Sequence, residues 1–360
     1  MTRTVVHVAS GREWRGGQRQ VLLLARELQR AGLDNQVAVT AAGSELAFRL
    51  KHEGIRVREA TWKLGLDPRV LLPILQEVRA GGALLHAHDA HAVTLAGICS
   101  FVTRVPLIAT RRVDFHLRHR GFWGRASRVI AISAAVADVL CEDGVDPTRV
   151  IVVHSGIDLE AARQAEPLGL RERLGLPAET TIACTVGALV PHKDHVTLLH
   201  AARRLALDFP ALQWVLAGDG ELRPVLEWLA RELDLTDRVH FLGQVTHPLR
   251  VIADADLYVM SSREEGLGTS VLDAMARGIP VASTSAGGLP EMLSQGAGVL
   301  VPPRNPEALA GAVRRILCDG DLRAKIVAQA SRAVERFSAD RMAAEVRSVY
   351  RSCAPAIEGS

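Results

Sequence analysis

The sequence predicts an α/β protein built from two doubly wound parallel sheets. Short apolar runs alternate with amphipathic helical segments along the chain, which is the pattern of repeated β-α-β units. The alternation stops at a segment rich in turn residues, 155–177, and then starts again. Because 360 residues are enough for two domains that each bury a core, we expect two such units.

The first series of elements precedes the turn-rich segment. The apolar runs predict strands at 5–9, 36–40, 55–59, 84–87, 107–110, 129–132 and 150–153. Helical periodicity or apolar length predicts helices at 21–30, 45–53, 68–79, 92–102 and 134–143. The segment 92–102 is apolar throughout and too short to cross a bilayer, so we expect a buried helix there.

The second series predicts another sheet. Its expected strands lie at 181–186, 211–217, 239–242, 257–260, 281–283 and 298–301. Ligands of open α/β sheets bind beyond the carboxyl ends of the strands, so the loops that follow these strands are the candidate sites. A final helix is expected at about 339–353.

Composition describes a water-soluble globular protein with mixed charge. Hydrophobic residues make up 48% of the chain and the net charge is only +3, which disfavours a nucleic-acid binder. The five cysteines show no paired spacing, which disfavours a zinc site or a disulfide scaffold. The N-terminus starts directly with a strand and resembles no signal peptide, so we expect a cytoplasmic protein, at most peripheral to the inner membrane face.

Basic residues are concentrated in the first half. Residues 1–160 carry 21 Lys and Arg against 16 Asp and Glu. One segment interleaves arginines with aromatic and apolar side chains: Arg104, Arg111, Arg112, Phe115, Leu117, Arg118, Arg120, Phe122, Trp123, Arg125 and Arg128. This mixture suits an anionic membrane surface or an anionic acceptor, and it equally fits a solvated surface of an arginine-rich protein.

The most informative stretch runs from Glu265 to Pro280, between two predicted strands. It reads as a glycine-bearing loop followed by a short helix, with acids at Glu265 and Asp273. The first amides of a helix are unpaired donors at the positive end of the helix dipole, which suits a phosphate. Carboxylates beside such a pocket can accept hydrogen bonds from sugar hydroxyls. The stretch therefore predicts a ligand that is part diphosphate and part polyol.

This pattern resembles the E-x7-E signature of the retaining glycosyltransferases of family 4, which have the GT-B fold. The resemblance covers nearly the whole chain, through Gly16-Gly17-Gln18, Val129–Ser133, Ser155–Asp158, Val186–Lys193, Ala217–Gly220, Val239–Gly243 and Gly287–Glu291. It implies two Rossmann-like domains facing across a cleft: an acceptor-binding domain at 1–165 and a nucleotide-sugar domain at 166–338. It also implies that the last helix, within 339–360, crosses back onto the N-terminal domain.

The resemblance assigns roles to three charged residues. Lys193 is similar to the family lysine that contacts the diphosphate, and Glu265 to the first glutamate, near the hydroxyls of the transferred sugar. Asp273 stands where the family has its second glutamate, which accepts bonds from the ribose. The family usually has an arginine where this chain has Ala188, so either Arg263 or the amides at 268–270 compensate, or donor binding is weaker.

Further contacts to the donor are implied by the resemblance. Backbone and packing contacts to it are expected from Gly17, Gly187, Gly218, Gly220, Leu242, Val245, Gly268, Thr269 and Ser270. No metal is expected, and no cofactor besides the nucleotide sugar, which is a substrate. Asp254-Ala255-Asp256 imitates a D-x-D metal motif, but its place before a buried strand favours a role at the end of a helix or the edge of a strand.

The acceptor side is predicted in the first half. His88 and Asp89 follow a strand, and Arg111 and Arg112 stand where many family members have a histidine. We expect these four residues to contact the acceptor or to line the cleft. His86 and His88 also have a spacing seen in metal sites, but no third ligand cluster accompanies them in the sequence.

Together these observations predict a retaining glycosyltransferase. It would move a sugar from a UDP- or GDP-sugar to a glycan or lipid acceptor, possibly in lipopolysaccharide or envelope polysaccharide biosynthesis. Two alternatives stay open: a sugar-nucleotide epimerase of the same fold, and a protein that binds sugar nucleotides without catalysis.

Overall fold

The computed structural model describes residues 4–63, 66–117 and 119–355, and these divide into two compact units. The first unit comprises the described parts of 1–156 and 338–360, and the second unit is 157–337. The predicted boundaries at 165/166 and 338/339 lie close to these. The short helix α6 (Leu159–Arg163) packs on α11 (Thr269–Arg277) of the second unit, which is why the first boundary falls earlier than predicted.

The first unit is a seven-stranded parallel sheet in the order β3-β2-β1-β4-β5-β6-β7. Its strands are β1 (Thr4–Ala9), β2 (Gln36–Ala41), β3 (Arg56–Ala60), β4 (Gly82–Ala87), β5 (Leu107–Arg111), β6 (Arg128–Ala131) and β7 (Val150–Val152). Its helices are α1 (Gly16–Arg30), α2 (Glu45–His52), α3 (Leu71–Arg79), α4 (Ala90–Thr103), α5 (Ala134–Glu142) and α15 (Ala339–Cys353). All seven predicted strands are present.

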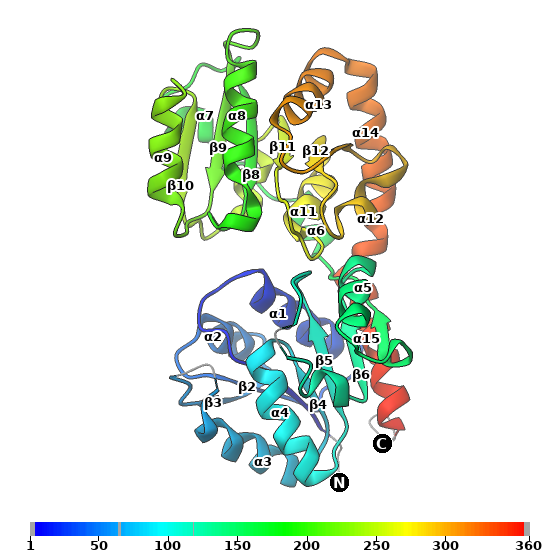
Figure 1. The fold of residues 1–360 in the computed structure, drawn as a ribbon. Coiled ribbons are helices and arrows are strands. Elements are labelled where there is room, and N and C mark those ends of the chain that lie inside the picture. The colour runs from blue at the N-terminus through cyan, green and yellow to red at the C-terminus, as the bar shows by residue number, and fades with distance from the viewer. Residues whose placement is uncertain (1–3, 64–65, 118, 356–360) are drawn as a thin grey trace. The chain divides into compact units, whose positions relative to one another are not determined.

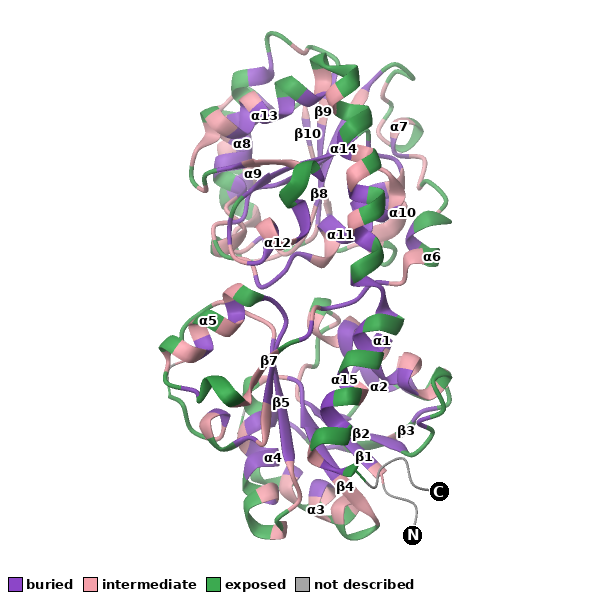
Figure 2. Ribbon diagram, turned by 90° about the vertical axis from the view of Figure 1, so that its right-hand side faces the viewer, coloured by how far each residue is buried: buried purple, intermediate pink, exposed green. Residues whose placement is uncertain are grey.

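Burial explains why these segments fold as they do. Strand β2 is buried at every position, as expected for an interior strand of a parallel sheet covered on both faces. Helix α1 buries Val21, Leu24 and Leu28 on one stripe and exposes its opposite side (Figure 2). It begins at Gly16, five residues before the predicted start, so the two glycines belong to its first turn.

The last helix completes the core of the first unit. Helix α15 packs on α1, and its Met342, Val346 and Val349 join the same apolar cluster as Leu24 and Leu28. The hydroxyl of the buried Tyr350 lies 2.6 Å from Nδ1 of His86 on β4. The C-terminal end of the chain thus belongs to the fold of the N-terminal unit.

The second unit is a six-stranded parallel sheet in the order β10-β9-β8-β11-β12-β13. Its strands are β8 (Thr181–Val186), β9 (Leu212–Ala217), β10 (Val239–Gly243), β11 (Leu257–Met260), β12 (Val281–Thr284) and β13 (Val299–Val301). Its other helices are α7 (Leu170–Arg173), α8 (His195–Leu205), α9 (Arg223–Glu232), α10 (Pro248–Ala253), α12 (Leu289–Leu293), α13 (Pro306–Cys318) and α14 (Gly320–Ala333). All six predicted strands are present here too.

The order of each sheet creates a switch point. In the first sheet β1 pairs with both β2 and β4, and in the second β8 pairs with both β9 and β11. The chain continues to one side of β1 and later to the other, and the same holds for β8. A crevice therefore forms at the carboxyl edge between the loops after β1 and β4, and another between the loops after β8 and β11.

One expectation about a helix was wrong. The segment 92–102 is helical, but Phe101 is 72% exposed and Val102 is 67% exposed, so α4 is not buried on all sides. One face of α4 packs against the rest of the unit, and the side chains at its C-terminal end are exposed to solvent. No helix among the described residues is both long enough and apolar enough to cross a membrane.

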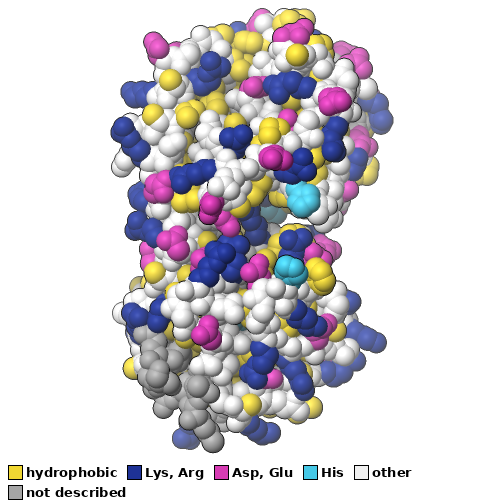
Figure 3. Space-filling model, turned by 180° about the vertical axis from the view of Figure 1, so that it is seen from behind, with side chains coloured by type: hydrophobic (Ala, Val, Ile, Leu, Met, Phe, Trp, Pro, Cys, Tyr) yellow, Lys and Arg dark blue, Asp and Glu magenta, His cyan; other side chains and the backbone are white. Residues whose placement is uncertain are grey.

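The charge is mixed on the surface. On the face drawn in Figure 3, Lys and Arg side chains are interspersed with Asp and Glu rather than gathered in one field. This fits the low net charge of the chain. Arg118 of the basic segment lies outside the described residues.

Candidate functional site

The candidate site of the second unit lies in the loops that follow the neighbouring strands β8 and β11. These loops are tied together by backbone and hydroxyl contacts. The Arg263 N–H donates to the carbonyl oxygen of His192 at 2.9 Å, and Ser261 Oγ donates to that of Lys193 at 3.0 Å. Residues about 70 positions apart in the sequence therefore share one small region.

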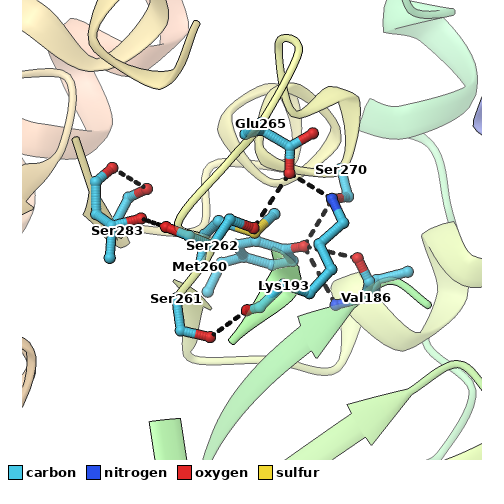
Figure 4. A network of polar contacts seen from close by, with 10 residues as sticks. Val186, Lys193, Met260, Ser261, Ser262, Glu265, Ser270 and Ser283 are labelled. Atoms are coloured by element: carbon cyan, nitrogen blue, oxygen red, sulfur yellow. Dashed lines mark hydrogen bonds and ion pairs between the residues drawn. The ribbon is translucent and has the colours of Figure 1, made fainter. Parts of the chain in front are cut away.

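An ion pair between Lys193 and Glu265 is the centre of this region (Figure 4). Their side chains are 18% and 11% exposed, so the pair is largely shielded from water. Ser262 Oγ donates to the same carboxylate oxygen at 3.2 Å, and the backbone oxygen of Glu265 accepts from Gly288 N at 3.0 Å. The two residues that the resemblance assigned to the diphosphate and the sugar are thus brought into direct contact.

The start of α11 provides amide donors beside this pair. Helix α11 has no side-chain cap and no acid in its first turn, at Thr269 and Ser270. Gly268 precedes it with φ +90°, and a Cβ there would come within 2.8 Å of Leu289 Cδ2, so only glycine fits. The uncapped amides and the helix dipole favour an anion at this end.

Tyr258 was not found by the sequence analysis. It lies on β11, fully buried, with its hydroxyl 2.7 Å from Ser270 Oγ and 3.2 Å from the backbone N and O of Val186. Burial raises the pKa of Tyr258 above its usual range, so the phenol stays protonated. It thereby positions the Ser270 hydroxyl at the helix start. A tyrosine inside a buried strand offers no sequence signal for this role.

Arg263 was expected as one possible replacement for the arginine missing at Ala188. Its Nε is buried and has no hydrogen-bond partner among the residues the structure describes. Its backbone is fixed beside the loop of Lys193, as described above. A guanidinium is a better bidentate phosphate ligand than an ammonium, and the compensation for Ala188 by Arg263 or by the amides at 268–270 stays a prediction.

Two of the predicted donor glycines are required by packing of the chain itself. A Cβ on Gly218, which has φ +148°, would lie 1.8 Å from Gly187 O, and one on Gly220 would lie 2.5 Å from Leu189 O. By contrast, a Cβ on Gly187 would meet only Lys193 Cε, at 3.8 Å. Leu242 and Val245, at and after the end of β10, are half-buried.

Asp273 lies one turn inside α11 and is only 2% exposed. Its assignment to the ribose stays a prediction.

Buried His195, the first residue of α8, was not predicted; its Nδ1 has no hydrogen-bond partner in the described chain, and burial lowers its pKa to about 4. The neighbouring charge of Lys193 is the second cause of this lowering, so His195 is neutral beside the ion pair.

The motif Asp254-Ala255-Asp256 proves to be structural. Asp254 accepts from the backbone N–H groups of Leu168 at 2.6 Å and Gly169 at 2.9 Å, which holds the start of α7. Asp256 pairs with Arg171 at 2.6 Å and accepts from a backbone amide. This is the helix-end and strand-edge role predicted from the sequence.

In the first unit, the predicted acceptor residues differ in their surroundings. Asp89 accepts from Ser10 N at 2.7 Å, from Ser10 Oγ at 2.5 Å and from Ala92 N at 3.0 Å, so it caps α4 and holds the loop after β1. Arg111 donates to Phe115 O at 2.5 Å and lies over the Trp123 ring. These contacts give both residues a structural role.

Arg112 and His88 have fewer partners. The Arg112 side chain reaches α1, where its Cδ lies 3.7 Å from the position of a Cβ on Gly17, and its buried Nε has no partner in the described chain. His88 is 4% exposed, and its Nδ1 likewise has no partner within the described residues. Arg112 is close enough to contribute to lowering the pKa of His88.

Three histidines of the first unit form a buried cluster that the sequence did not reveal, because His7 comes from a different strand. One nitrogen from each of His7, His86 and His88 lies within 4.8 Å of the others, which is compatible with metal ligation. Both nitrogens of His7 and both of His86 already have hydrogen-bond partners, however. His7 bonds to His88 and Gln36, while His86 bonds separately to Tyr350 and Thr110, so a metal would have to displace existing hydrogen bonds.

Comparison with known proteins places the chain in a family. Residues 14–161 match the family model "Glycosyltransferase Family 4", and residues 169–333 match the model "Glycosyl transferases group 1". The chain belongs to glycosyltransferase family 4. The second match contains the Lys193–Glu265 pair and α11, and the first contains Gly17, His88 and Arg112.

Curated relatives are similar in sequence over more than half of this chain. A D-inositol 3-phosphate glycosyltransferase of Streptomyces bingchenggensis is 35% identical over 243 residues, covering 63% of this chain and 53% of that protein. An uncharacterized glycosyltransferase of Methanocaldococcus jannaschii is 32% identical, with 62% and 60% covered. This chain thus spans little more than half the length of the curated relatives it matches.

Solved structures share the fold. HepE of Anabaena, solved in complex with UDP and glucose, superimposes with a TM-score of 0.87 at 22% identity, covering 97% of this chain and all of that chain. The same protein was also solved with UDP-glucose. With these neighbours, the prediction of a GT-B fold made of two Rossmann-like domains is confirmed.

Proposed function

We propose that this family 4 member transfers a sugar from a nucleotide diphosphate sugar, UDP- or GDP-linked, to a hydroxyl of a glycan or lipid acceptor. The observation that carries the proposal is the shielded Lys193–Glu265 pair beside the uncapped start of α11. Cation, carboxylate and helix amides together match the two halves of a sugar nucleotide. Binding of UDP and UDP-glucose by HepE, which has the same fold, supports this class of donor.

The charges of the second unit suggest how the leaving group is stabilised. Lys193, Arg263 and the amides of Gly268 to Ser270 would neutralise the diphosphate, whose negative charge grows as the glycosidic bond breaks. Glu265 would leave Lys193 when the donor binds and accept hydrogen bonds from hydroxyls of the transferred sugar. The existing contact from Ser262 would hold the carboxylate in place during this exchange.

We propose that the anomeric configuration is retained, as the family resemblance implies. The bond between the anomeric carbon and the diphosphate oxygen breaks, a bond to the acceptor oxygen forms on the same face, and the acceptor proton passes to the diphosphate. This route needs no nucleophile from the protein. Glu265 is then a hydrogen-bond acceptor rather than an attacking group.

The acceptor class is proposed from the first unit, and membrane contact belongs to the same proposal. The exposed Phe101 and Val102 of α4 are accompanied by the guanidinium of Arg125, 6.0 Å from the Phe101 ring. Apolar side chains with a cation suit peripheral contact with anionic lipid, and hence a lipid-linked acceptor such as an envelope or lipopolysaccharide precursor. The test is co-sedimentation with phosphatidylglycerol vesicles at low salt, where Phe101→Ser should reduce binding and Phe48→Ser, on α2, should not.

The function itself is tested with a panel of UDP-, GDP- and ADP-sugars. Binding should raise the unfolding temperature for one nucleotide series, and nucleotide release should then require an added acceptor. Conversion of the donor without acceptor would identify an epimerase instead. Binding with no turnover on any acceptor would indicate a protein that only binds sugar nucleotides. Absence of all nucleotide binding would overturn the proposal.

A further inference from the structure

The hydroxyl of Tyr258 joins the end of one strand to the start of a helix in the second unit. The phenol oxygen lies 2.7 Å from Ser270 Oγ in α11, and 3.2 Å from both the backbone N and the backbone O of Val186 at the end of β8. Val186 and Ser270 are drawn with the Lys193–Glu265 pair in Figure 4. A buried tyrosine needs a partner for its hydroxyl, and Val186 alone would supply one. The contact with Ser270 is therefore more than the burial of the phenol requires.

The direction of this hydrogen bond follows from the single proton of the phenol. The Val186 N–H can only donate, so the phenol oxygen accepts from it. The phenol proton then goes either to Ser270 Oγ at 2.7 Å or to Val186 O at 3.2 Å. Since O–H···O bonds are commonest at about 2.7–2.8 Å, the contact with Ser270 takes the proton. Burial raises the pKa of Tyr258 above its usual range, so this proton is present at neutral pH.

Ser270 consequently keeps its own hydroxyl proton for another acceptor. Its Oγ accepts from Tyr258, and its side chain makes no other hydrogen bond within the part of the chain that the structure describes. A helical serine often donates to the carbonyl four residues earlier, but here that residue, Gly266, precedes the helix. Ser270 is only half-buried. Its proton therefore adds to the amides that already favour an anion at the start of α11.

We propose that Tyr258 is a positioning residue for the diphosphate, and that it acts by donating to Ser270 Oγ so that the Ser270 proton points to a phosphate oxygen. Tyr258 is fully buried and does not touch the ligand itself. This deepens the proposed function, on which it rests, by adding a side-chain hydroxyl to the cations and amides that bind the leaving group. No proton is transferred in this scheme, because Ser270 keeps its proton and only donates a hydrogen bond.

The Ser270 hydroxyl should act on both binding and turnover. A hydrogen bond to an anionic oxygen strengthens as the negative charge of that oxygen grows, and the charge of the diphosphate grows as the glycosidic bond breaks. Ser270→Ala should therefore lower kcat as well as raise the donor KM. The acceptor KM should stay unchanged, because the hydroxyl is assigned to the leaving group alone.

The hydroxyl can be tested without knowing the sugar or the base. Inorganic pyrophosphate is titrated by calorimetry into the full chain, at constant ionic strength and without divalent metal. Ser270→Ala should weaken pyrophosphate binding about tenfold, as for one hydrogen bond to a charged group. Tyr258→Phe should weaken it about threefold or more, because the Ser270 hydroxyl then has no fixed orientation. Two matched controls, the buried hydroxyl variant Ser283→Ala on β12 and the buried phenol variant Tyr350→Phe on α15, should bind pyrophosphate like wild type.

A double variant that combines Tyr258→Phe with Ser270→Ala separates positioning from general support of the fold. If Tyr258 acts through Ser270, the double variant should bind pyrophosphate within about twofold of Ser270→Ala alone. Losses that multiply to about thirtyfold would mean that Tyr258 supports the site by another route, and would overturn the proposal. Stability in urea should behave differently. Tyr258→Phe should lower it with or without the Ser270 hydroxyl, because Val186 loses its contacts with the phenol in both cases.

Titration with UDP, or with GDP if the nucleotide panel selects it, separates this inference from the proposed function. Ser270→Ala should reduce nucleotide and pyrophosphate affinity by the same factor, because the hydroxyl acts on the phosphates that both share. A loss for the nucleotide alone would assign the hydroxyl to the nucleoside and overturn the proposal. Equal pyrophosphate affinity in wild type and Ser270→Ala, or no pyrophosphate binding by wild type, would overturn it too. If wild type bound pyrophosphate but no nucleotide, the proposed function would fail while the pyrophosphate titration still decided the role of Tyr258.

Discussion

The contact between Lys193 and Glu265 makes opposite predictions for its two members. Without a ligand, Glu265 holds the ammonium group that the diphosphate of a donor would need. Replacing Glu265 by Gln removes a competing negative charge and keeps the shape of the side chain. We therefore expect Glu265→Gln to leave UDP affinity unchanged or to tighten it by up to about tenfold, whereas Lys193→Met should weaken it by about 10- to 150-fold, as for loss of one charge-assisted hydrogen bond.

The same pair sets the expected effects on stability. An exposed ion pair contributes about 0–1 kcal/mol, and breaking a fully buried one costs about 3–5 kcal/mol. With side chains 18% and 11% exposed, this pair lies between those limits. Lys193→Met should therefore lower the free energy of unfolding of the second unit by about 1–3 kcal/mol. Glu265→Gln should cost less, because Lys193 can turn its flexible stem towards solvent.

The assays are calorimetric titration with UDP and unfolding in urea, followed by turnover with the donor identified in the panel. Glu265→Gln should lower turnover strongly although it binds UDP at least as well as wild type, because Glu265 is assigned to the sugar. Two results would refute this reasoning. One is a Glu265→Gln variant that loses as much UDP affinity as Lys193→Met, and the other is a Lys193→Met variant that binds UDP like wild type.

Three further predictions follow from local geometry and from burial. Gly218→Ala should destabilise the second unit by about 2 kcal/mol or more in urea unfolding, because its Cβ would lie 1.8 Å from a backbone oxygen, while Gly187→Ala should cost less than about 1 kcal/mol. Burial lowers the pKa of His7 to about 4 and that of His86 and His88 well below 6.5, so the unfolded chain binds more protons between these values. Stability should thus fall as pH drops below about 6.5, by up to about 1.4 kcal/mol per pH unit for each histidine, and His7→Asn should flatten that slope in urea titrations at pH 5 and 7.5. Turnover should be insensitive to EDTA, and full loss that Mg²⁺ or Zn²⁺ restores would show that a metal is required.

The strands could be predicted because they depend on local pattern. Most of the expected strands are apolar runs that the sheets bury, although the edge strands β3 and β7 are largely exposed or half-buried. The second unit begins at residue 157, ahead of the predicted start at 166, because α6 packs against α11, more than a hundred residues away in the sequence. The exposed end of α4 was missed for a related reason, since an apolar run does not reveal which of its faces meets the sheet.

The charged residues of the candidate site could be predicted from the sequence, but the residues that hold them in place could not. Lys193 and Glu265 stand in motifs with characteristic spacing, so they could be named from the sequence. Tyr258 and Ser262 act through contacts made by a buried strand and its exit loop, and neither position has a recognisable pattern. His7 joins His88 across 81 positions only because β1 and β4 are neighbours in the sheet.

Arg111 and Arg112 show most clearly what pattern alone cannot decide. As letters they are two adjacent cations at the end of one strand, and both were assigned to the acceptor. Adjacent residues at a strand end point to opposite sides, so one side chain meets a carbonyl and an indole ring while the other meets the start of α1. Arg111 finds an internal acceptor in Phe115 O, whereas Arg112 has no hydrogen bond within the described residues, although the buried Nε of each lacks a partner there. If Arg111→Gln left the free energy of unfolding of the first unit unchanged while Arg112→Gln lowered it by more than about 1 kcal/mol, this division of tasks between the two arginines would be wrong.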